Sequence, residues 1–125
     1  PVPTRTDASE QSLQHGKTLA LQGDARRGIP ACTQCHGVAL TGVAPAIPSL
    51  LGLPRLYLAS QLGDWLNNGR HALPPDCMAQ VGRRLNSADI NAVASWLALQ
   101  PVPANPKPAP ALPGPLPMPC SAMGN

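Results

Sequence analysis

The hydrophobic residues of the chain recur at helical spacing in three stretches, and segments rich in glycine and proline separate these stretches. The first stretch predicts a helix that Ser9 caps and that runs to about Leu21. Gly16 lies inside this helix, where glycine costs about 1 kcal/mol relative to alanine, so we expect another helix to approach closely there. The second stretch predicts a helix that starts at Pro54 and stops before the Asn-Asn-Gly sequence at 67–69.

The third stretch predicts a helix over residues 88–99, which Ser87 caps and Pro101 ends. We interpret residues 70–86, with their double proline at 74–75, as a loop. No strand pattern and no internal repeat is present. The sequence therefore predicts an all-α fold with three main helices and long loops.

Proline is unusually frequent and aromatic residues are scarce: the 125 residues include 17 Pro and 11 Gly but no Phe, one Tyr and two Trp. Such a chain has few large side chains for a core, and a buried prosthetic group would supply the missing apolar surface. Nine of the prolines lie between positions 101 and 119. The composition predicts a folded domain over residues 1–100 and a proline-rich C-terminal extension over residues 101–125, which either forms a polyproline II spacer or drapes over the domain.

The net charge of +3 comes from scattered Lys and Arg, with no basic run and no aromatic residues on which bases could stack. This composition excludes a nucleic-acid-binding function. It is compatible with an acidic partner protein, whose association it would accelerate. No apolar run of about 18 residues is present, so we expect no membrane span.

The chemistry of the chain is concentrated in the pentapeptide Cys-Thr-Gln-Cys-His at positions 32–36. A C-x-x-C-H motif is the attachment signature of c-type haem. Its two thiols add to the vinyl groups on one edge of the porphyrin, and its histidine is the proximal ligand of the iron. The motif predicts one covalent haem c, attached through Cys32 and Cys35, with His36 as the first axial ligand.

Other interpretations of the cysteine pair are weaker. A zinc site needs a second ligand pair at similar spacing, but the remaining cysteines, Cys77 and Cys120, stand far apart and lack such partners. A redox dithiol of the thioredoxin type needs a βαβ context, which the proline-rich segment after the motif does not provide. A disulfide-stabilised domain without haem is a further alternative, which a colourless protein from the native host would support.

The occupant of the sixth coordination position decides what such a haem does. A methionine thioether gives a closed iron that only transfers electrons, whereas an open position allows peroxide or gas chemistry. We predict Met78 as this ligand, because it follows a double proline and precedes the last helix, on a stiffened loop. The alternatives are Met118 and Met123 in the extension, and the nitrogen ligands His15 and His71, which we expect to face solvent.

With these features the chain resembles class I c-type cytochromes, especially small bacterial periplasmic ones and single domains of two-haem relatives. The resemblance covers about residues 12–100. It rests on Gly16, the segments 29–37, 47–52 and 57–62, Met78, and the segments 85–90 and 93–97.

The resemblance implies a cytochrome c fold wrapped around one haem. It also implies that the carbonyl of Pro48 accepts a hydrogen bond from the ring N–H of His36, which orients the imidazole. Gly16 and Trp96 would mark the crossing of the first and last helices. The expected cofactor-binding residues are Cys32, Cys35, His36, Pro48 and Met78, with His36 and Met78 on the iron and no catalytic residues. Arg70, Arg83 and Arg84 are either partners of the haem propionates or solvated side chains.

Two features depart from the usual pattern of these cytochromes: Cys77 beside the predicted ligand, and the extension with Cys120. We predict a disulfide between these two cysteines, because haem c is attached after export to an oxidising compartment. For the same reason we expect a periplasmic protein whose signal peptide has been removed, with residue 1 near the mature N-terminus.

The predicted function is the transport of single electrons between redox partner proteins, with a dehydrogenase as donor and an oxidase or another cytochrome as acceptor. Two alternatives stay open. The chain is the electron-accepting cytochrome subunit of a larger dehydrogenase, or it is a haem enzyme or gas sensor with a labile sixth ligand. Carbon monoxide binding to the reduced protein would favour the last of these.

Overall fold

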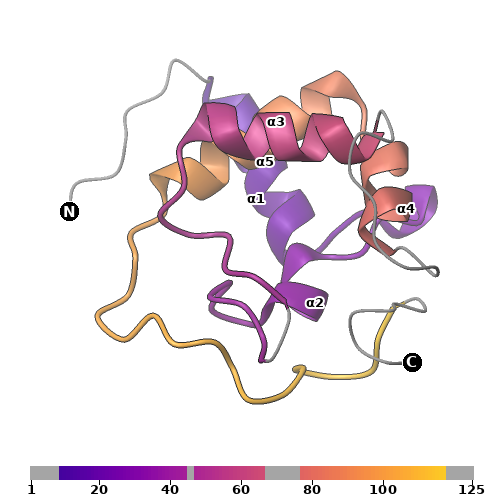
Figure 1. Ribbon diagram of the computed structural model, residues 1–125. Coiled ribbons are helices and arrows are strands. Elements are labelled where there is room, and N and C mark those ends of the chain that lie inside the picture. Colours follow the sequence, from indigo (N-terminus) through magenta and orange to yellow (C-terminus); the bar gives the residue numbers. More distant parts are fainter. Residues whose placement is uncertain (1–8, 45–46, 67–76, 118–125) are drawn as a thin grey trace.

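The computed structural model describes residues 9–44, 47–66 and 77–117 (Figure 1), and these residues form helices joined by irregular segments. Extended pairing within these ranges is limited to three isolated bridges, Asp24–Ile29, Val43–Ile47 and Val43–Ala109. None of the helices in the same ranges has the length and apolar character needed to cross a membrane. The predicted all-α class is confirmed. The helices are α1 (Glu10–Leu21), the 3₁₀ helix η1 (Ala25–Arg27), α2 (Cys32–His36), α3 (Arg55–Leu66), α4 (Cys77–Arg84) and α5 (Ser87–Leu99).

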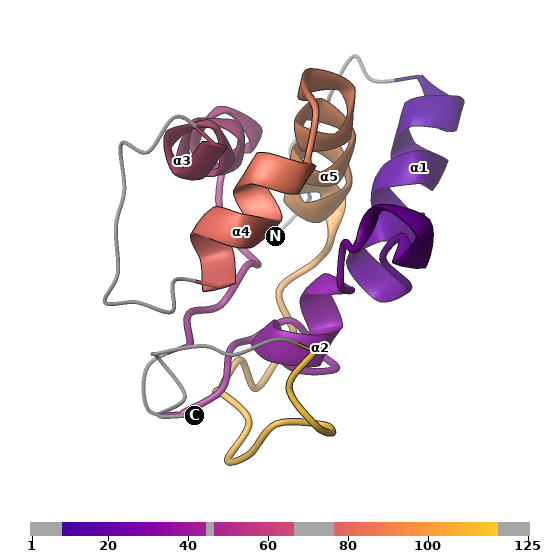
Figure 2. The ribbon, with the colours of Figure 1, turned by 90° about the vertical axis from the view of Figure 1, so that its right-hand side faces the viewer.

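Helices α1 and α5 form the centre of the fold and lie side by side in Figure 2. α1 starts where the sequence predicts, because the Oγ atom of Ser9 accepts a hydrogen bond from the backbone N–H of Ser12 at 3.1 Å. Gly16 is on its buried face. A Cβ atom at this position would overlap the carbonyl oxygen of Ala92 and lie 3.0 Å from the Cβ atom of Trp96. The predicted crossing at Gly16 and Trp96 is therefore present, and only glycine permits it.

α5 begins at Ser87, one residue earlier than predicted, because Asn86 rather than Ser87 caps it. The Oδ1 atom of Asn86 accepts a hydrogen bond from the backbone N–H of Asp89 at 2.8 Å, and Oδ2 of Asp89 accepts one from the backbone N–H of Asn86 at 2.9 Å. This reciprocal pair is a capping box. Asp89 stands three positions after Asn86, whereas Ile90 stands three positions after Ser87. Only the cap at Asn86 therefore gains a second hydrogen bond from an acidic side chain.

Residues 77–84 form α4, which packs against α3, so the prediction of a loop over residues 70–86 was wrong for this part. The double proline at 74–75, which suggested the loop, lies outside the described residues. Met78, Val81 and Leu85 recur at helical spacing, and Leu85, the residue that follows α4, is buried in the core. Met78 consequently lies in the first turn of a helix.

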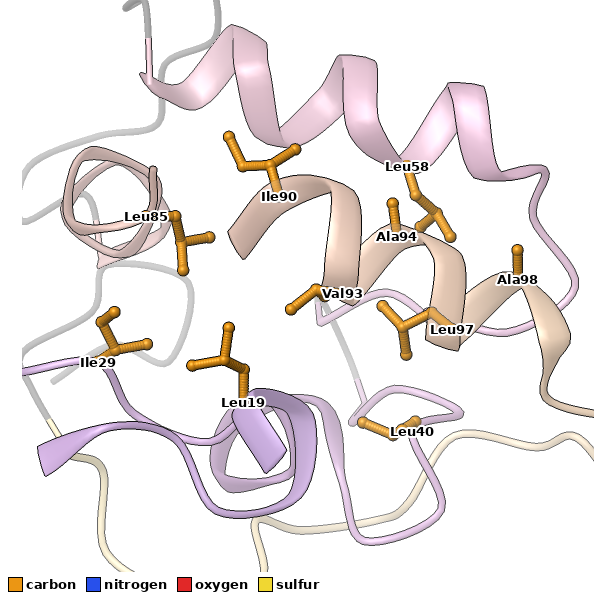
Figure 3. Packing of buried hydrophobic residues seen from close by; sticks show 10 residues of the cluster. All are labelled: Leu19, Ile29, Leu40, Leu58, Leu85, Ile90, Val93, Ala94, Leu97 and Ala98. Carbon is orange, nitrogen blue, oxygen red and sulfur yellow. The ribbon is translucent and has the colours of Figure 1, made fainter. Parts of the chain in front are cut away.

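A single hydrophobic core joins α1, α3 and α5 to the loops beside α2 (Figure 3). Its buried members are mostly leucines and small aliphatic residues, as the scarcity of aromatic residues requires. Partly buried apolar side chains from several different elements pack against this core and form a fringe around it. The core residues are Leu19, Ile29, Leu40, Leu58, Leu85, Ile90, Val93, Ala94, Leu97 and Ala98, and the fringe consists of Cys32, Leu50, Leu51, Leu53, Ala59, Leu62, Val81 and Trp96.

Candidate functional site

The motif Cys32–His36 forms α2, a single short helix that packs against α1. Ala31 precedes it, and the side chain of Gln34 accepts a hydrogen bond from the backbone N–H of Ala31 at 2.8 Å. The helix ends at Gly37, whose φ of 91° favours glycine. The helical turn places the two cysteines, three residues apart, on neighbouring positions of one face.

Both thiols of the motif are half-buried and unpaired. Burial raises the pKa of the Cys32 thiol to about 11, and burial also raises the pKa of Cys35 above its ordinary value. A redox dithiol or a zinc ligand needs a thiolate, which a lowered pKa would favour. Among the described residues, no group of three or more His, Cys, Asp or Glu side chains is arranged to hold a metal ion. The surroundings of the pair therefore suit protonated thiols that become thioethers.

The imidazole of His36 has one defined hydrogen bond: its Nδ1 atom lies 2.8 Å from the carbonyl oxygen of Pro48. A carbonyl oxygen only accepts, so Nδ1 carries the ring proton and Nε2 presents its lone pair. Burial lowers the pKa of His36, while the hydrogen bond to Pro48 raises it to a smaller extent. The hydrogen bond to Pro48 thus selects the tautomer that an iron ligand needs, with Nε2 available for the metal.

The loop after α2 holds the Pro48 carbonyl in place through its own backbone hydrogen bonds. Val43 and Ile47 exchange two hydrogen bonds of 3.0 Å, and the N–H of Leu50 donates to the carbonyl of Leu40 at 2.9 Å. Leu40 has a φ of 62°, which is rare for leucine, and burial in the core keeps it there. Backbone hydrogen bonds therefore fix the loop both before and after Pro48.

Met78 is partly buried in the first turn of α4, and α4 lies above α2 in both ribbon views (Figures 1 and 2). α4 packs on α3 whereas α2 packs on α1, so Met78 and His36 come from separate parts of the fold. The structure brings Cys32, Cys35, His36 and Pro48 together around α2. The other proposed ligands Met118, Met123 and His71, and also Arg70 and Cys120, lie outside the described residues, as does the side chain of Cys77.

Two of the remaining candidates, Arg84 and His15, have partners away from α2. Arg84 donates a hydrogen bond to the carbonyl oxygen of Gly28, and Arg83 is exposed and interacts with other residues. His15 is partly exposed, at 43% of its side-chain surface, but its Nε2 atom lies 2.8 Å from Oδ1 of Asp89, so it does not simply face solvent as predicted. Its ring is held between α1 and α5.

Sequence reasoning missed the cluster to which this histidine belongs. The carboxylate of Asp89 is only 2% exposed and accepts hydrogen bonds from His15, from Arg27 and from its own helix cap. Although burial opposes ionisation, the hydrogen bonds from Arg27, Asn86 and His15 hold the pKa of Asp89 at about 2. The available signal was that Asp89 is the single charged residue in the sequence of α5.

The donor set around α2 fits a covalent haem. The cysteines share one helical turn and the imidazole presents Nε2. Cys32 belongs to the partly buried fringe, which leaves apolar side chains such as Leu51, Leu53 and Val81 incompletely covered by protein. A porphyrin is the kind of flat apolar group that would cover this fringe.

Comparison with known proteins agrees with this chemistry. The sequence model of the cytochrome c family matches residues 13–100. The chain is 40% identical over 102 residues to a protein named thiosulfate dehydrogenase electron acceptor from Thiomonas intermedia, covering 82% of this chain and 45% of the relative. It is 34% identical over 101 residues to cytochrome c4 from Azotobacter vinelandii, covering 76% of this chain and 46% of the relative. The chain thus spans less than half the length of these curated relatives.

Solved structures show the same likeness. A thiosulfate dehydrogenase from Marichromatium purpuratum superposes with a TM-score of 0.71 at 34% identity, over 80% of this chain and 21% of that one. Cytochrome c4 from Pseudomonas stutzeri superposes with a TM-score of 0.62 at 29% identity, over 79% of this chain and 52% of that one. Both likenesses extend over most of the described fold.

Proposed function

Because the chain belongs to the cytochrome c family, we propose that it is an electron-accepting haem domain that serves a thiosulfate dehydrogenase. Family membership confirms the predicted cytochrome c fold, the covalent haem c at Cys32 and Cys35, and electron transfer as the work of this domain. The bound haem supplies a one-electron Fe(III)/Fe(II) couple. The chain itself supplies the attachment points, the axial ligands and the apolar surroundings.

We propose that His36 and Met78 are the axial ligands. For His36 the support is the imidazole whose Nδ1–H is held by Pro48, which leaves Nε2 as the only ring donor for a metal. For Met78 the support is its position, partly buried in the first turn of α4, a helix that packs on α3 whereas α2 packs on α1. A thioether in the sixth position raises the reduction potential and closes the iron to exogenous ligands.

The observation that carries the choice of partner is the higher identity to thiosulfate dehydrogenase electron acceptors, 40% and 38%, than to the two cytochromes c4, 34% and 32%. The thiosulfate dehydrogenase from Marichromatium purpuratum also has a higher TM-score, 0.71, than the cytochrome c4 from Pseudomonas stutzeri, 0.62. On this proposal the donor is a dehydrogenase that oxidises thiosulfate, and the acceptor is a downstream oxidase or cytochrome.

Two further expectations complete the proposal. The domain works in the periplasm, where haem c is attached and where Cys77 and Cys120 meet an oxidising environment. These cysteines form the disulfide that would tie the extension to α4, whose first residue is Cys77. The disulfide stays a prediction, because Cys120 lies outside the described residues.

The ligand proposal is tested by absorption spectra of the oxidised and reduced protein. Met78→Ala is expected to abolish the sulfur-to-iron charge-transfer band and to let the reduced protein bind carbon monoxide. Met118→Ala and Met123→Ala are the matched controls and are expected to keep the band. If the wild type lacks the band, the assignment of Met78 is wrong, and an open site or a nitrogen ligand such as His71 takes its place. If Met78→Ala retains the band, a methionine of the extension, Met118 or Met123, is the ligand instead.

The partner proposal is tested by mixing the oxidised protein with thiosulfate and the purified thiosulfate dehydrogenase of Thiomonas intermedia. We expect rapid growth of the reduced haem absorption bands, none when the dehydrogenase is omitted, and a rate that falls as ionic strength rises if charge steers the encounter. Slow reduction, no faster than that of an unrelated c-type cytochrome of similar potential, would contradict the partner. Electron transfer by the haem would still stand.

A further inference from the structure

The proline-rich extension does not leave the domain after α5 but returns to the loop that follows the haem motif. Ala109 donates its N–H to the carbonyl of Gly42 at 2.9 Å, and its carbonyl accepts a hydrogen bond from the N–H of Ala44 at 2.8 Å. These two bonds form the parallel bridge between Val43 and Ala109. A residue of the extension therefore pairs with the loop on both its donor and its acceptor side.

Side-chain packing supports this pairing at two further points. Cβ atoms built at Gly37 and Gly52 would lie 3.8 Å from Cβ of Ala109 and 3.2 Å from Cγ2 of Val102, respectively. Between the extension and the loop lies an open pocket of about 310 Å³ whose lining includes Val38, Thr41, Lys107 and Ala111. The described part of the extension thus drapes over the domain, the second of the two courses considered from its composition.

The clamped loop is the one that carries the partner of His36. Gly42, which receives the hydrogen bond of Ala109, itself donates to the carbonyl of His36 at 2.9 Å. Its φ is 93°, and a Cβ atom there would lie 2.5 Å from the carbonyl oxygen of Ile47 and 2.9 Å from the carbonyl carbon of Pro48. Ala109 is therefore connected to the Pro48 carbonyl through one tightly packed residue.

We propose that Ala109 is a positioning residue for the proximal ligand: its two backbone hydrogen bonds, to Gly42 and Ala44, clamp the loop after the haem motif and so hold the Pro48 carbonyl against His36. The inference rests on the proposed ligation of the iron by His36. A strong hydrogen bond at Nδ1 makes the imidazole a better electron donor and stabilises the ferric state. Loosening the clamp weakens that bond, so the reduction potential rises.

The test uses the complete haem-loaded chain and the substitution Ala109→Pro. Proline has no N–H, so this variant loses the hydrogen bond that residue 109 donates to the carbonyl of Gly42. Ala104→Pro is the matched control, because Ala104 is an exposed residue in the same extension and is not part of the bridge. Ala109→Pro is expected to raise the reduction potential and to accelerate exchange of the His36 ring N–H with solvent about fivefold, the ratio that corresponds to one ordinary hydrogen bond. Ala104→Pro is expected to change neither.

A second variant separates loss of the clamp from general misfolding. Replacing both Pro108 and Pro110 by Gly keeps the donor of residue 109 but makes the extension more flexible, and is expected to shift the potential in the same direction by a smaller amount. Faster exchange of the Ala44 amide in both variants, with an unchanged helical circular dichroism spectrum, would support the clamp. Equal potentials and equal ring N–H exchange in Ala109→Pro, Ala104→Pro and the wild type would overturn it.

Failure of the proposed ligation would show itself differently. A wild-type spectrum without a low-spin, histidine-ligated haem would refute the role of His36 before any variant is made. An ordinary spectrum combined with an insensitive potential would refute only the role of Ala109. The two outcomes cannot be confused.

Discussion

Arg27 and Asp89 form a two-pronged ion pair that joins the segment before the haem motif to the start of the last helix. Nη1 of Arg27 lies 2.7 Å from Oδ2 of Asp89, and Nη2 lies 3.1 Å from Oδ1. Asp24 binds the Nε atom of the same guanidinium at 2.9 Å. The buried carboxylate therefore holds η1, α1 and α5 in one arrangement, directly ahead of the residues that attach the haem.

We predict that Asp89→Asn lowers the free energy of unfolding by about 2–3 kcal/mol. Asparagine can keep the capping hydrogen bonds, but it removes the charge that faces Arg27 in a buried position. Urea denaturation followed by the absorption and circular dichroism of the holoprotein measures this change. Asp24→Asn is the control with a smaller expected effect, since this carboxylate is 32% exposed whereas that of Asp89 is 2% exposed. Equal stability of Asp89→Asn and the wild type would contradict the structural role given to this pair.

The same carboxylate predicts a pH dependence of stability. The pKa of Asp89 is about 2 in the folded protein, below its ordinary value of 3.8. A depressed pKa contributes stability above the unfolded-state pKa, and this contribution is lost as pH falls through the folded-state pKa. We therefore expect the wild type to lose on the order of 2 kcal/mol between about pH 4 and pH 2 from this group alone. The difference between wild type and Asp89→Asn, measured across that range, isolates the effect and should shrink as the pH falls.

We predict that Gly16→Ala destabilises the protein by more than about 3 kcal/mol, because the new Cβ atom meets the backbone carbonyl of Ala92 and cannot be relieved by a side-chain rotation. The matched control is Gly63→Ala in α3, where a Cβ atom meets nothing within 4 Å. That substitution is expected to stabilise by about 0.5–1 kcal/mol through helix propensity. Thermal unfolding of both variants measures the contrast, and a stable Gly16→Ala protein would show that the helices can separate at no cost.

The predicted disulfide has a direct chemical test. If Cys77 and Cys120 are joined, alkylation under denaturing, non-reducing conditions leaves the monomer mass unchanged, because Cys32 and Cys35 are bound in thioethers. Prior reduction then adds two alkyl groups. Two alkyl groups without reduction would show free thiols and remove the proposed tie between the extension and α4.

Local patterns allowed much of the fold to be predicted. The cap at Ser9, the spacing of the motif and the cost of Gly16 each depend on neighbours within one or two turns or on backbone geometry. α4 was missed because it is only eight residues long and closely follows a double proline, which indicated a loop. The roles of Asp89 and Ala109 depend on residues far away in the sequence, and nothing in their local surroundings indicates which partner each will meet. The bond between His36 and Pro48 was expected from resemblance alone, since spacing does not specify which carbonyl faces the ring.

The contact between Gly16 and Ala92 has a consequence for how the protein comes apart. These residues lie near opposite ends of the helical domain, so their crossing closes the segment between residues 16 and 92 into one loop that contains α2, α3 and α4. Closing a loop of that length carries an entropic cost that increases only slowly with further residues. The contacts between α1 and α5 offset this entropic cost. If these two helices separate, the loop opens, and the segment that surrounds the haem is no longer closed. We therefore expect a single cooperative transition in which the hydrophobic core, the position of α4 with Met78 and the packing of α2 against α1 are lost together.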